Sequence, residues 1–262
     1  MDEGNAPQFN PFRLQGQRVL ITGASSGLGR HFACTLAKAG ATVALAARSA
    51  DKLAEAAAEI RSLGALATAV TLDVTDGASV RHAVAQVEAD MGPITTLVNN
   101  AGVVVSKALF EHDEQDWDRV VDTNLKGAWL VSQEVTRHMV AHGQGGAIIN
   151  IASILGIRVV GGIPEYCTSK AGLIHLTKVL ALELARHTIR VNAIAPGYIR
   201  TDLNRGFFES EAGQAMIRRI PQRRLGEASD LDGALLLLAS DASRYMTGAV
   251  ITVDGGHLLS AL

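Results

Sequence analysis

Two side chains with acid–base chemistry lie four residues apart in the stretch PEYCTSKAGL, residues 164–173. If the stretch is helical, Tyr166 and Lys170 share one face, because residues four apart are neighbours on a helix. An ammonium close to a phenol lowers the phenol pKa from its reference of about 10, and a phenol tuned in this way can give or take a proton. The alternative is an amphipathic helix in which the tyrosine packs and the lysine is solvated.

Apolar and helix-forming segments alternate along the chain and place this pair in a larger fold. Short, continuously apolar runs predict buried strands at 18–22, 42–47, 67–72, 95–99, 147–152, 189–195 and 249–253. Longer segments between them predict helices at 27–39, 50–63, 76–91, 114–141, 164–187 and 230–239. This alternation is typical of right-handed βαβ units. The sequence therefore predicts an α/β fold with one doubly wound, Rossmann-type sheet of seven parallel strands and helices on both faces.

The domain organisation follows from what the chain lacks. It contains no linker rich in Pro, Gly or Ser and no internal repeat, which predicts a single catalytic domain over residues 13–262. The polar residues 1–12 are expected to form a mobile N-terminal extension. The stretch 198–226 reads as one long irregular segment, yet it carries apolar residues such as Phe207 and Phe208. We expect this stretch to be a substrate lid.

Composition excludes several classes of protein. Of the 262 residues, 48% are apolar and 19% charged, and the formal charge is −2, which indicates a globular protein without a strong field for nucleic acid or anionic membranes. The longest apolar run, 234–239, is too short to span a membrane. The N-terminus has no apolar signal segment, and Cys34 and Cys167 suit reduced thiols, so we expect a cytoplasmic protein. The eight histidines are scattered without Cys or Glu at ligand spacing, so no metal site is predicted.

The segment TGASSGLG, residues 22–29, follows the first predicted strand and opens the first predicted helix. Small residues let a backbone approach a pyrophosphate, and a helix N-terminus stabilises the negative charge. A plain tight turn is the alternative, since the chain contains 26 glycines. The position between strand and helix favours a cofactor-binding turn made of Gly23, Ser25, Ser26, Gly27, Leu28 and Gly29.

The end of the second predicted strand bears on the choice of cofactor. A site for NAD places Asp or Glu there to hold the ribose hydroxyls, but this chain has Arg48 and Ser49. A guanidinium can pair with the 2′-phosphate of NADP, and the Ser49 hydroxyl can assist. The alternative is a solvated Arg48 and a Ser49 that caps the next helix. We therefore expect NADP(H), with NAD(H) less favoured.

Polar residues or turns follow most of the predicted strands, and the carboxyl ends of parallel strands share the edge where ligands bind. Together, several motifs in order resemble the short-chain dehydrogenase/reductase family over about residues 13–257. They are TGASSGLG at 22–29, NNAG at 99–102, Asn124 in DTNLKG, Ser153, YCTSK at 166–170 and PGYIRT at 196–201. The resemblance implies a seven-stranded parallel sheet, a dehydrogenase or ketoreductase activity and a homotetramer.

The resemblance also implies four catalytic roles. Tyr166 would protonate the carbonyl oxygen in reduction and act as the base in oxidation. Lys170 would hold the nicotinamide ribose and lower the Tyr166 pKa. Ser153 would hydrogen-bond the substrate oxygen, and Asn124 would hold a water that links Lys170 to solvent.

Further cofactor contacts are implied in the same way. They are Asp73 and Val74 for the adenine, Asn99, Ala101 and Gly102 for the ribose and nicotinamide path, and Ile199 and Thr201, beside Pro196 and Gly197, for the carboxamide. Each of these residues also has a purely structural explanation. Asp73 and Thr201, for example, could cap the helices that follow them. Glu165 departs from the family pattern, and we expect it to point away from Lys170, because adjacent helix residues do not share a face.

The substrate stays open at the level of sequence. A general carbonyl reductase is our first interpretation, with a 3-oxoacyl-thioester reductase or a gluconate-type keto-aldonate dehydrogenase as alternatives. The lid arginines are either a solvated surface or an anion site; they are Arg218, Arg219, Arg223 and Arg224. A non-catalytic dinucleotide-binding protein is a remote alternative, because such a protein would not need both Tyr166 and Lys170. The apolar tail HLLSAL, residues 257–262, also favours a homo-oligomer.

Overall fold

A computed structural model of the protein describes residues 10–201 and 205–260. Most of the predicted extension, residues 1–9, lies outside the described residues, as do residues 202–204 of the predicted lid and the last two residues of the apolar tail. In the described part of the chain, no helix is both long and apolar enough to cross a membrane.

The predicted seven-stranded parallel sheet is confirmed, with the order β3-β2-β1-β4-β5-β6-β7. Almost every residue of the central strands is buried, because helices cover both faces. The strands are β1 (Arg18–Thr22), β2 (Thr42–Ala47), β3 (Ala67–Thr71), β4 (Thr96–Asn99), β5 (Gly146–Ile151), β6 (Ile189–Pro196) and β7 (Val250–Val253).

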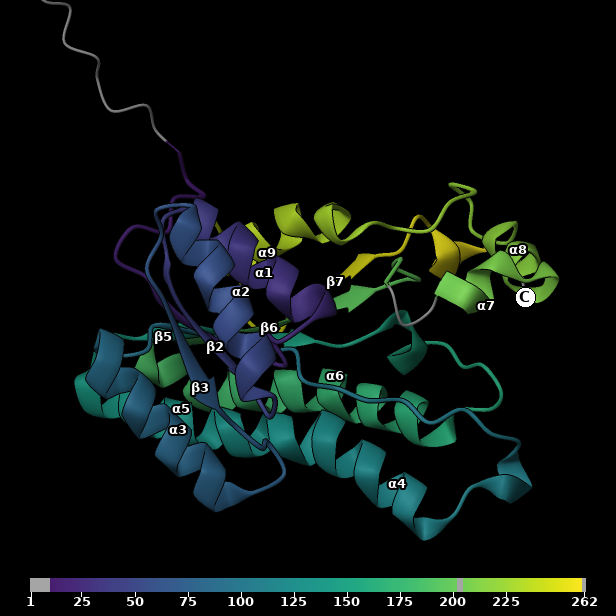
Figure 1. Cartoon of the computed structure of the whole chain (residues 1–262), viewed down its shortest axis with the longest axis horizontal. Helices are drawn as coiled ribbons and strands as arrows, with labels where there is room; N and C mark the ends of the chain where they lie inside the picture. The colour runs from purple at the N-terminus through teal and green to yellow at the C-terminus, as the bar shows by residue number, and fades with distance from the viewer. Residues whose placement is uncertain (1–9, 202–204, 261–262) are drawn as a thin grey trace, which may run out of the picture.

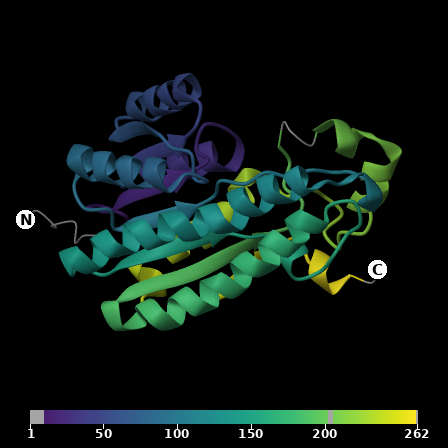
Figure 2. The same ribbon diagram turned by 90° about the horizontal axis from the view of Figure 1, so that it is seen from below.

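The helices form a layer on each side of the sheet (Figure 1). One apolar core lies between the sheet and α1, α2 and α9, and a second lies between the sheet and α3, α5 and α6. Figure 2 shows α5 and α6 running side by side beneath the second face. The helices are α1 (Gly27–Lys38), α2 (Ala50–Ser62), α3 (Gly77–Met91), α4 (Glu114–Val121), α5 (Gly127–His142), α6 (Pro164–Leu184), α7 (Arg205–Glu209), α8 (Glu211–Ile217) and α9 (Asp232–Ala239).

The direction in which the chain adds strands reverses between β1 and β4, and such a switch point opens a crevice at the carboxyl ends of the strands. Side chains join the two strands there. The Thr22 hydroxyl accepts hydrogen bonds from the N–H groups of Asn100 (3.0 Å) and Ala101 (3.1 Å). The Asn100 amide donates to the carbonyl oxygens of Thr22 (3.0 Å) and Gly23 (3.2 Å).

The predicted continuous helix over 114–141 is wrong in one respect. A π-helical turn, Asp122–Lys126, separates α4 from α5. Asn124 lies in this turn, and its side chain bonds both backbone groups of Val103, accepting from the N–H (2.7 Å) and donating to the carbonyl oxygen (2.9 Å). The extra residue of a π turn turns a side chain out of the regular helical pattern, and such turns are frequent at functional sites.

The predicted irregular stretch 198–226 contains the two short helices α7 and α8, which lie together at one end of the molecule (Figure 1). It has a small core of its own around Phe208, Ile220 and Leu225. A bridge between Ile199 and Gly226 brings the two ends of the stretch together. The described residues of this stretch therefore form a compact helical segment, whereas the sequence predicted an irregular loop.

Candidate active site

Tyr166 and Lys170 lie on one face of α6, and Ser153 follows the end of β5. The Ser153 side chain hydrogen-bonds the Tyr166 phenol. It also accepts a bond from the Leu155 N–H (3.1 Å), which holds the short 3-10 turn Ile154–Gly156. The Lys170 ammonium lies 5.7 Å from the centre of the Tyr166 ring. The structure thus brings together the three residues that the sequence predicted to act on a carbonyl group.

Lys170 is buried, with 4% of its surface exposed, and its Nζ donates to the Ile151 carbonyl oxygen at 2.7 Å. Gly102 faces it from the end of β4, where a Cβ atom would lie 3.6 Å from Lys170 Nζ and 3.3 Å from Asn124 Oδ1. Asn124 is buried as well, and its amide donates to the Ser169 hydroxyl (3.2 Å). Asn124, Gly102 and Lys170 therefore form one continuous polar cluster behind the tyrosine.

The pKa of Tyr166 is raised, whereas the sequence predicted that Lys170 would lower it. Burial raises the pKa of the phenol, and the hydrogen bond with Ser153 opposes only part of that rise. Burial also lowers the pKa of the Lys170 ammonium, to about 8. With a pKa of about 8 the Lys170 ammonium stays mostly charged at neutral pH, but its hydrogen bond goes to the Ile151 carbonyl oxygen, and burial dominates the Tyr166 pKa. In the protein alone, the predicted lowering of the Tyr166 pKa is wrong.

The glycine turn is built for close backbone contact. Gly23 has a φ of +66°, and a Cβ there would lie 2.8 Å from the Ala101 backbone. A Cβ on Gly29 would lie 2.3 Å from the Gly23 carbonyl oxygen. Gly27 opens α1, and Ser26 precedes it without a side-chain cap, so the first N–H groups of the helix have no cap from that hydroxyl. Ser25 and Leu28 are half-buried in the same turn.

Arg48 and Ser49 lie just beyond the end of β2, and both are exposed. Ser49 precedes α2 but its side chain does not cap the helix, which removes the structural explanation for this residue. Arg48 forms no ion pair with any described residue. Its charge reaches Asp73, whose pKa is lowered by the backbone and side chain of Thr75 first and by Arg48 to a lesser degree.

The other predicted cofactor residues divide into two groups. Val74 packs against Gly127 behind Asp73, and Ile199 is buried at the base of the lid stretch next to the half-buried Thr201. Pro196 ends β6, and Gly197 passes so close to Asp254 that a Cβ would lie 2.7 Å from its Cα.

Asn99 behaves differently, because its side chain points into the protein interior. Its amide donates to Ser132 Oγ (2.8 Å) and to Asn150 Oδ1 (2.9 Å). Only its backbone faces the crevice end of β4. Its neighbour Asn100 and Thr22, which tie β1 to β4, were missed at the level of sequence, although Asn100 is part of the NNAG motif that could have indicated it.

Glu165 points away from Lys170, as predicted. Its carboxylate is buried and lies 2.5 Å from His112 Nδ1, and the other nitrogen of that ring lies 3.1 Å from the Lys107 carbonyl oxygen. This contact attaches the start of α6 to the loop that follows β4. This contact was not predictable from the sequence, because the two residues are far apart in the chain.

A basic and aromatic wall lies beside the tyrosine. Arg158 donates to the His257 carbonyl oxygen (2.6 Å), and the rings of His257 and Tyr198 are 5.4 Å apart. Burial raises the pKa of Tyr198, and the charge of Arg158 opposes that rise. Tyr198 also raises the Tyr166 pKa, so this wall lies within electrostatic reach of the phenol. Sequence reasoning did not single out Arg158, Tyr198 or His257.

The two phenylalanines and the arginines of the predicted lid lie in positions less suited to binding a substrate. Phe208 packs inside the lid stretch and Phe207 is exposed. Arg224 pairs with Asp230 through two hydrogen bonds (2.6 and 3.0 Å), while Arg218, Arg219 and Arg223 are exposed. A hollow of about 1050 Å³ lies between α1 and α9 and includes none of the predicted catalytic or cofactor-binding residues.

Comparisons with known proteins agree with this arrangement. The family model described as Enoyl-(Acyl carrier protein) reductase matches residues 23–257. The chain is similar to gluconate 5-dehydrogenase of Gluconobacter oxydans, with 39% identity covering 95% of this chain and 97% of that protein. It is also similar to a 3-oxoacyl-[acyl-carrier-protein] reductase of Thermotoga maritima, with 40% identity over 94% and 100% of the two chains.

Among solved structures, the fold matches a gluconate 5-dehydrogenase from Burkholderia cenocepacia in complex with NADP and tartrate. The TM-score is 0.92 with 38% identity, and the match covers 96% of this chain and 98% of that chain. The likeness therefore extends over the whole described fold, including the crevice at the carboxyl ends of the strands.

The burial of Lys170 predicts how stability changes with pH. Its pKa is about 8 in the folded chain against an ordinary value of 10.5, so between these values the unfolded chain binds more protons at this site. The contribution of Lys170 to folding is therefore least favourable below pH 8 and improves as the pH rises toward 10.5, by about 3 kcal/mol in total.

Urea unfolding of Lys170→Met and wild type at pH 7 and pH 10 measures this contribution. We expect the variant to gain stability relative to wild type at pH 7 and to lose most of that relative gain at pH 10. Lys178→Met, which removes an exposed lysine from the same helix, should show no such change. A difference between Lys170→Met and wild type that is constant with pH would contradict the burial argument.

Proposed function

Because the chain belongs to the short-chain dehydrogenase/reductase family, whose members act on CH–OH groups, we propose that it transfers a hydride between NADP(H) and a ketone or its secondary alcohol, as a carbonyl reductase. The observation that carries the proposal is the cluster of Ser153, Tyr166, Lys170 and Asn124 at one edge of the sheet. Each of these side chains has a structural explanation alone, but their convergence on a buried lysine does not.

Ketone reduction adds a hydride to the carbonyl carbon and a proton to the oxygen. The reduced nicotinamide supplies the hydride when it is bound. Tyr166 gives the proton, since its raised pKa keeps the phenol protonated at neutral pH. Ser153 already hydrogen-bonds that phenol, so it is placed to hold the substrate oxygen at the same point. Lys170 then returns a proton to Tyr166, and solvent replaces it through the water that Asn124 would hold.

The residues present fit an NADP molecule. Gly23 leaves no room for a side chain, which allows close approach of a pyrophosphate to the turn and to the start of α1. Arg48 is exposed and the Ser49 hydroxyl does not cap α2, so both side chains suit a 2′-phosphate. Asp73, whose pKa Arg48 helps to lower, would bind the adenine. NADP is bound in the related B. cenocepacia structure. We propose that residues 13–262 act as one catalytic domain, with the segment 198–226 as the lid.

The cofactor proposal predicts a selective effect of Arg48→Ala. The variant should lose about 10- to 100-fold in kcat/KM for NADPH and change little for NADH, because only NADPH carries the phosphate that the guanidinium would bind. Steady-state assays with both cofactors measure the ratio. Lys52→Ala, which removes a nearby exposed cation, is the matched control. An equal loss of kcat/KM with both cofactors would show that Arg48 does not bind the 2′-phosphate.

A keto-aldonate is the second candidate substrate, and Arg158 is the observation that favours it. Its guanidinium lies in the wall beside Tyr166 and uses one nitrogen for the His257 carbonyl, which leaves the other side of the fork for a carboxylate. Gluconate, which is named as the substrate of the related gluconate 5-dehydrogenases, has such a carboxylate. The 3-oxoacyl part of a thioester carries no carboxylate and so gains less from Arg158.

A substrate panel separates these candidates. NADPH oxidation is followed with an aryl ketone, a 3-oxo ester, a 3-oxoacyl thioester and a keto-aldonate, for wild type and Arg158→Met. If the keto-aldonate is the substrate, Arg158→Met should reduce its kcat/KM by about 10-fold or more and leave the neutral ketones nearly unchanged. Turnover of the neutral ketones alone, unaffected by the substitution, would support a broad carbonyl reductase.

We also propose a cytoplasmic homotetramer. The free thiols of Cys34 and Cys167 suit a reducing compartment. Exposed apolar side chains on adjacent helices support subunit contacts, among them Trp129 on α5 and Val179 and Leu182 on α6, the last being 83% exposed. Light scattering at micromolar concentration should give the mass of four chains. Leu182→Glu should reduce that mass, whereas a monomeric wild type would contradict the proposal.

A further inference from the structure

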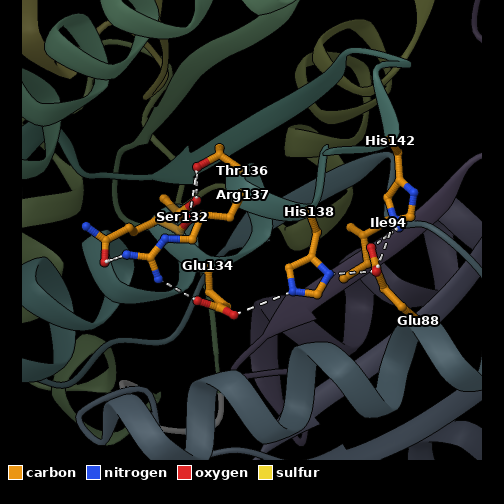
Figure 3. Close-up of polar contacts among 9 residues, drawn as sticks. Glu88, Ile94, Ser132, Glu134, Thr136, Arg137, His138 and His142 are labelled. Atoms are coloured by element: carbon orange, nitrogen blue, oxygen red, sulfur yellow. Dashed lines mark hydrogen bonds and ion pairs between the residues drawn. The ribbon is translucent and has the colours of Figure 1, made fainter. Parts of the chain in front are cut away.

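A cluster of two histidines and one glutamate joins α3 to α5 (Figure 3). Glu88 lies on α3, and His138 and His142 lie one turn apart on α5. Glu88 Oε2 is 2.7 Å from His138 Nδ1 and 3.2 Å from His142 Nε2. We propose that this cluster binds a divalent transition-metal ion of the Zn²⁺ class, which cross-links the two helices.

The distances are close to those of a coordinated ion. Ligands about 2.0–2.2 Å from a tetrahedral Zn²⁺ are about 3.3 Å from one another. The separation between Glu88 and His142 already has this value, and that between Glu88 and His138 needs to widen by about 0.6 Å. The three candidate ligand atoms, one from each residue, all lie within 4.8 Å of one another. His138 and His142 are 30% and 39% exposed, so an ion can enter and a water can complete the tetrahedron.

The ligands are oriented by a second layer of contacts (Figure 3). The other oxygen of Glu88 accepts a bond from the Ile94 N–H (3.1 Å), which directs Oε2 toward the histidines. Glu134 Oε1 lies 3.5 Å from the far nitrogen of His138, and Arg137 donates to the same carboxylate (2.9 Å). A carboxylate behind a histidine fixes the tautomer of a metal ligand and strengthens it as a donor.

The donor set selects the kind of ion. Two imidazoles and one carboxylate suit Zn²⁺, Ni²⁺ or Cu²⁺, whereas Ca²⁺ and Mg²⁺ prefer oxygen ligands throughout. A neutral imidazole donates one hydrogen bond only, yet His138 has a carboxylate near each nitrogen. A cation at Nδ1, with the N–H directed to Glu134, satisfies both sides of the ring.

The position of the cluster assigns it a structural role. Glu88 and His142 lie near the ends of α3 and α5, which lead into β4 and β5 at their amino ends, opposite the candidate active site. An ion there takes no part in hydride transfer. It would instead fasten α3 to α5 and stabilise the folded state. The sequence did not predict it, because Glu88 is 50 residues from His138.

Calorimetric titration of ZnCl₂ into the full chain, dialysed against a chelator and then against plain buffer, tests the proposal without any substrate or cofactor. We expect one ion per chain, with a dissociation constant in the micromolar range or tighter and a rise in Tm. His142→Ala and Glu88→Gln should each weaken Zn²⁺ binding by about 10-fold or more and remove the rise in Tm.

His82→Ala, which removes an exposed histidine from α3, is the matched control and should bind Zn²⁺ as wild type does. Circular dichroism establishes that each variant is folded. Absence of Zn²⁺ binding by wild type would overturn the proposal, and so would equal binding by wild type, His142→Ala and Glu88→Gln. Because the readout is metal binding and Tm, the result is independent of whether the chain reduces ketones.

Discussion

The burial of the Lys170 ammonium is the constraint on which the candidate active site depends. A buried charge needs polar partners, and here the Ile151 carbonyl oxygen at the end of β5 accepts a hydrogen bond from Lys170 Nζ at 2.7 Å. The lysine also needs space, which Gly102 provides at the end of β4. Neighbouring strands and α6 therefore have to meet at this point with little tolerance.

The π-helical turn serves the same arrangement. Asn124 lies in this turn, and its side chain bonds the backbone of Val103 and the Ser169 hydroxyl. By bonding both backbone groups of Val103, Asn124 fixes the chain just after the NNAG motif. The loop beyond β4 is attached again by the His112–Glu165 contact at the start of α6. Helix α6, which carries Tyr166, and this loop are thus held together at two places.

Much of this fold was predictable from the sequence. The continuously apolar runs and the helix-forming segments between them predicted the seven parallel strands, because both signals are local. The convergence of Gly23, Ser153 and Tyr166 followed from topology, since carboxyl ends of parallel strands share an edge.

What escaped prediction depends on contacts between distant residues. The direction of the Tyr166 pKa is set by burial, which a spacing of four residues does not reveal. The lid helices are stabilised by their own small core around Phe208. The Asn99 side chain points into the interior because it hydrogen-bonds Asn150 on the neighbouring strand β5. The Glu88 cluster needs α3 and α5 to be adjacent, which the sequence alone does not reveal, and no metal site was predicted there.

The most direct test of the account compares Tyr166→Phe with wild type, both for NADPH affinity and for turnover of the best ketone of the panel. The phenylalanine retains the ring and removes the hydroxyl group that carries the transferred proton. The account predicts that the dissociation constant for NADPH stays within about threefold while kcat falls by at least about 100-fold. Tyr245→Phe, which alters a fully exposed tyrosine, should behave as wild type. Retention by Tyr166→Phe of more than about a hundredth of the wild-type kcat would contradict the role of Tyr166 as proton donor.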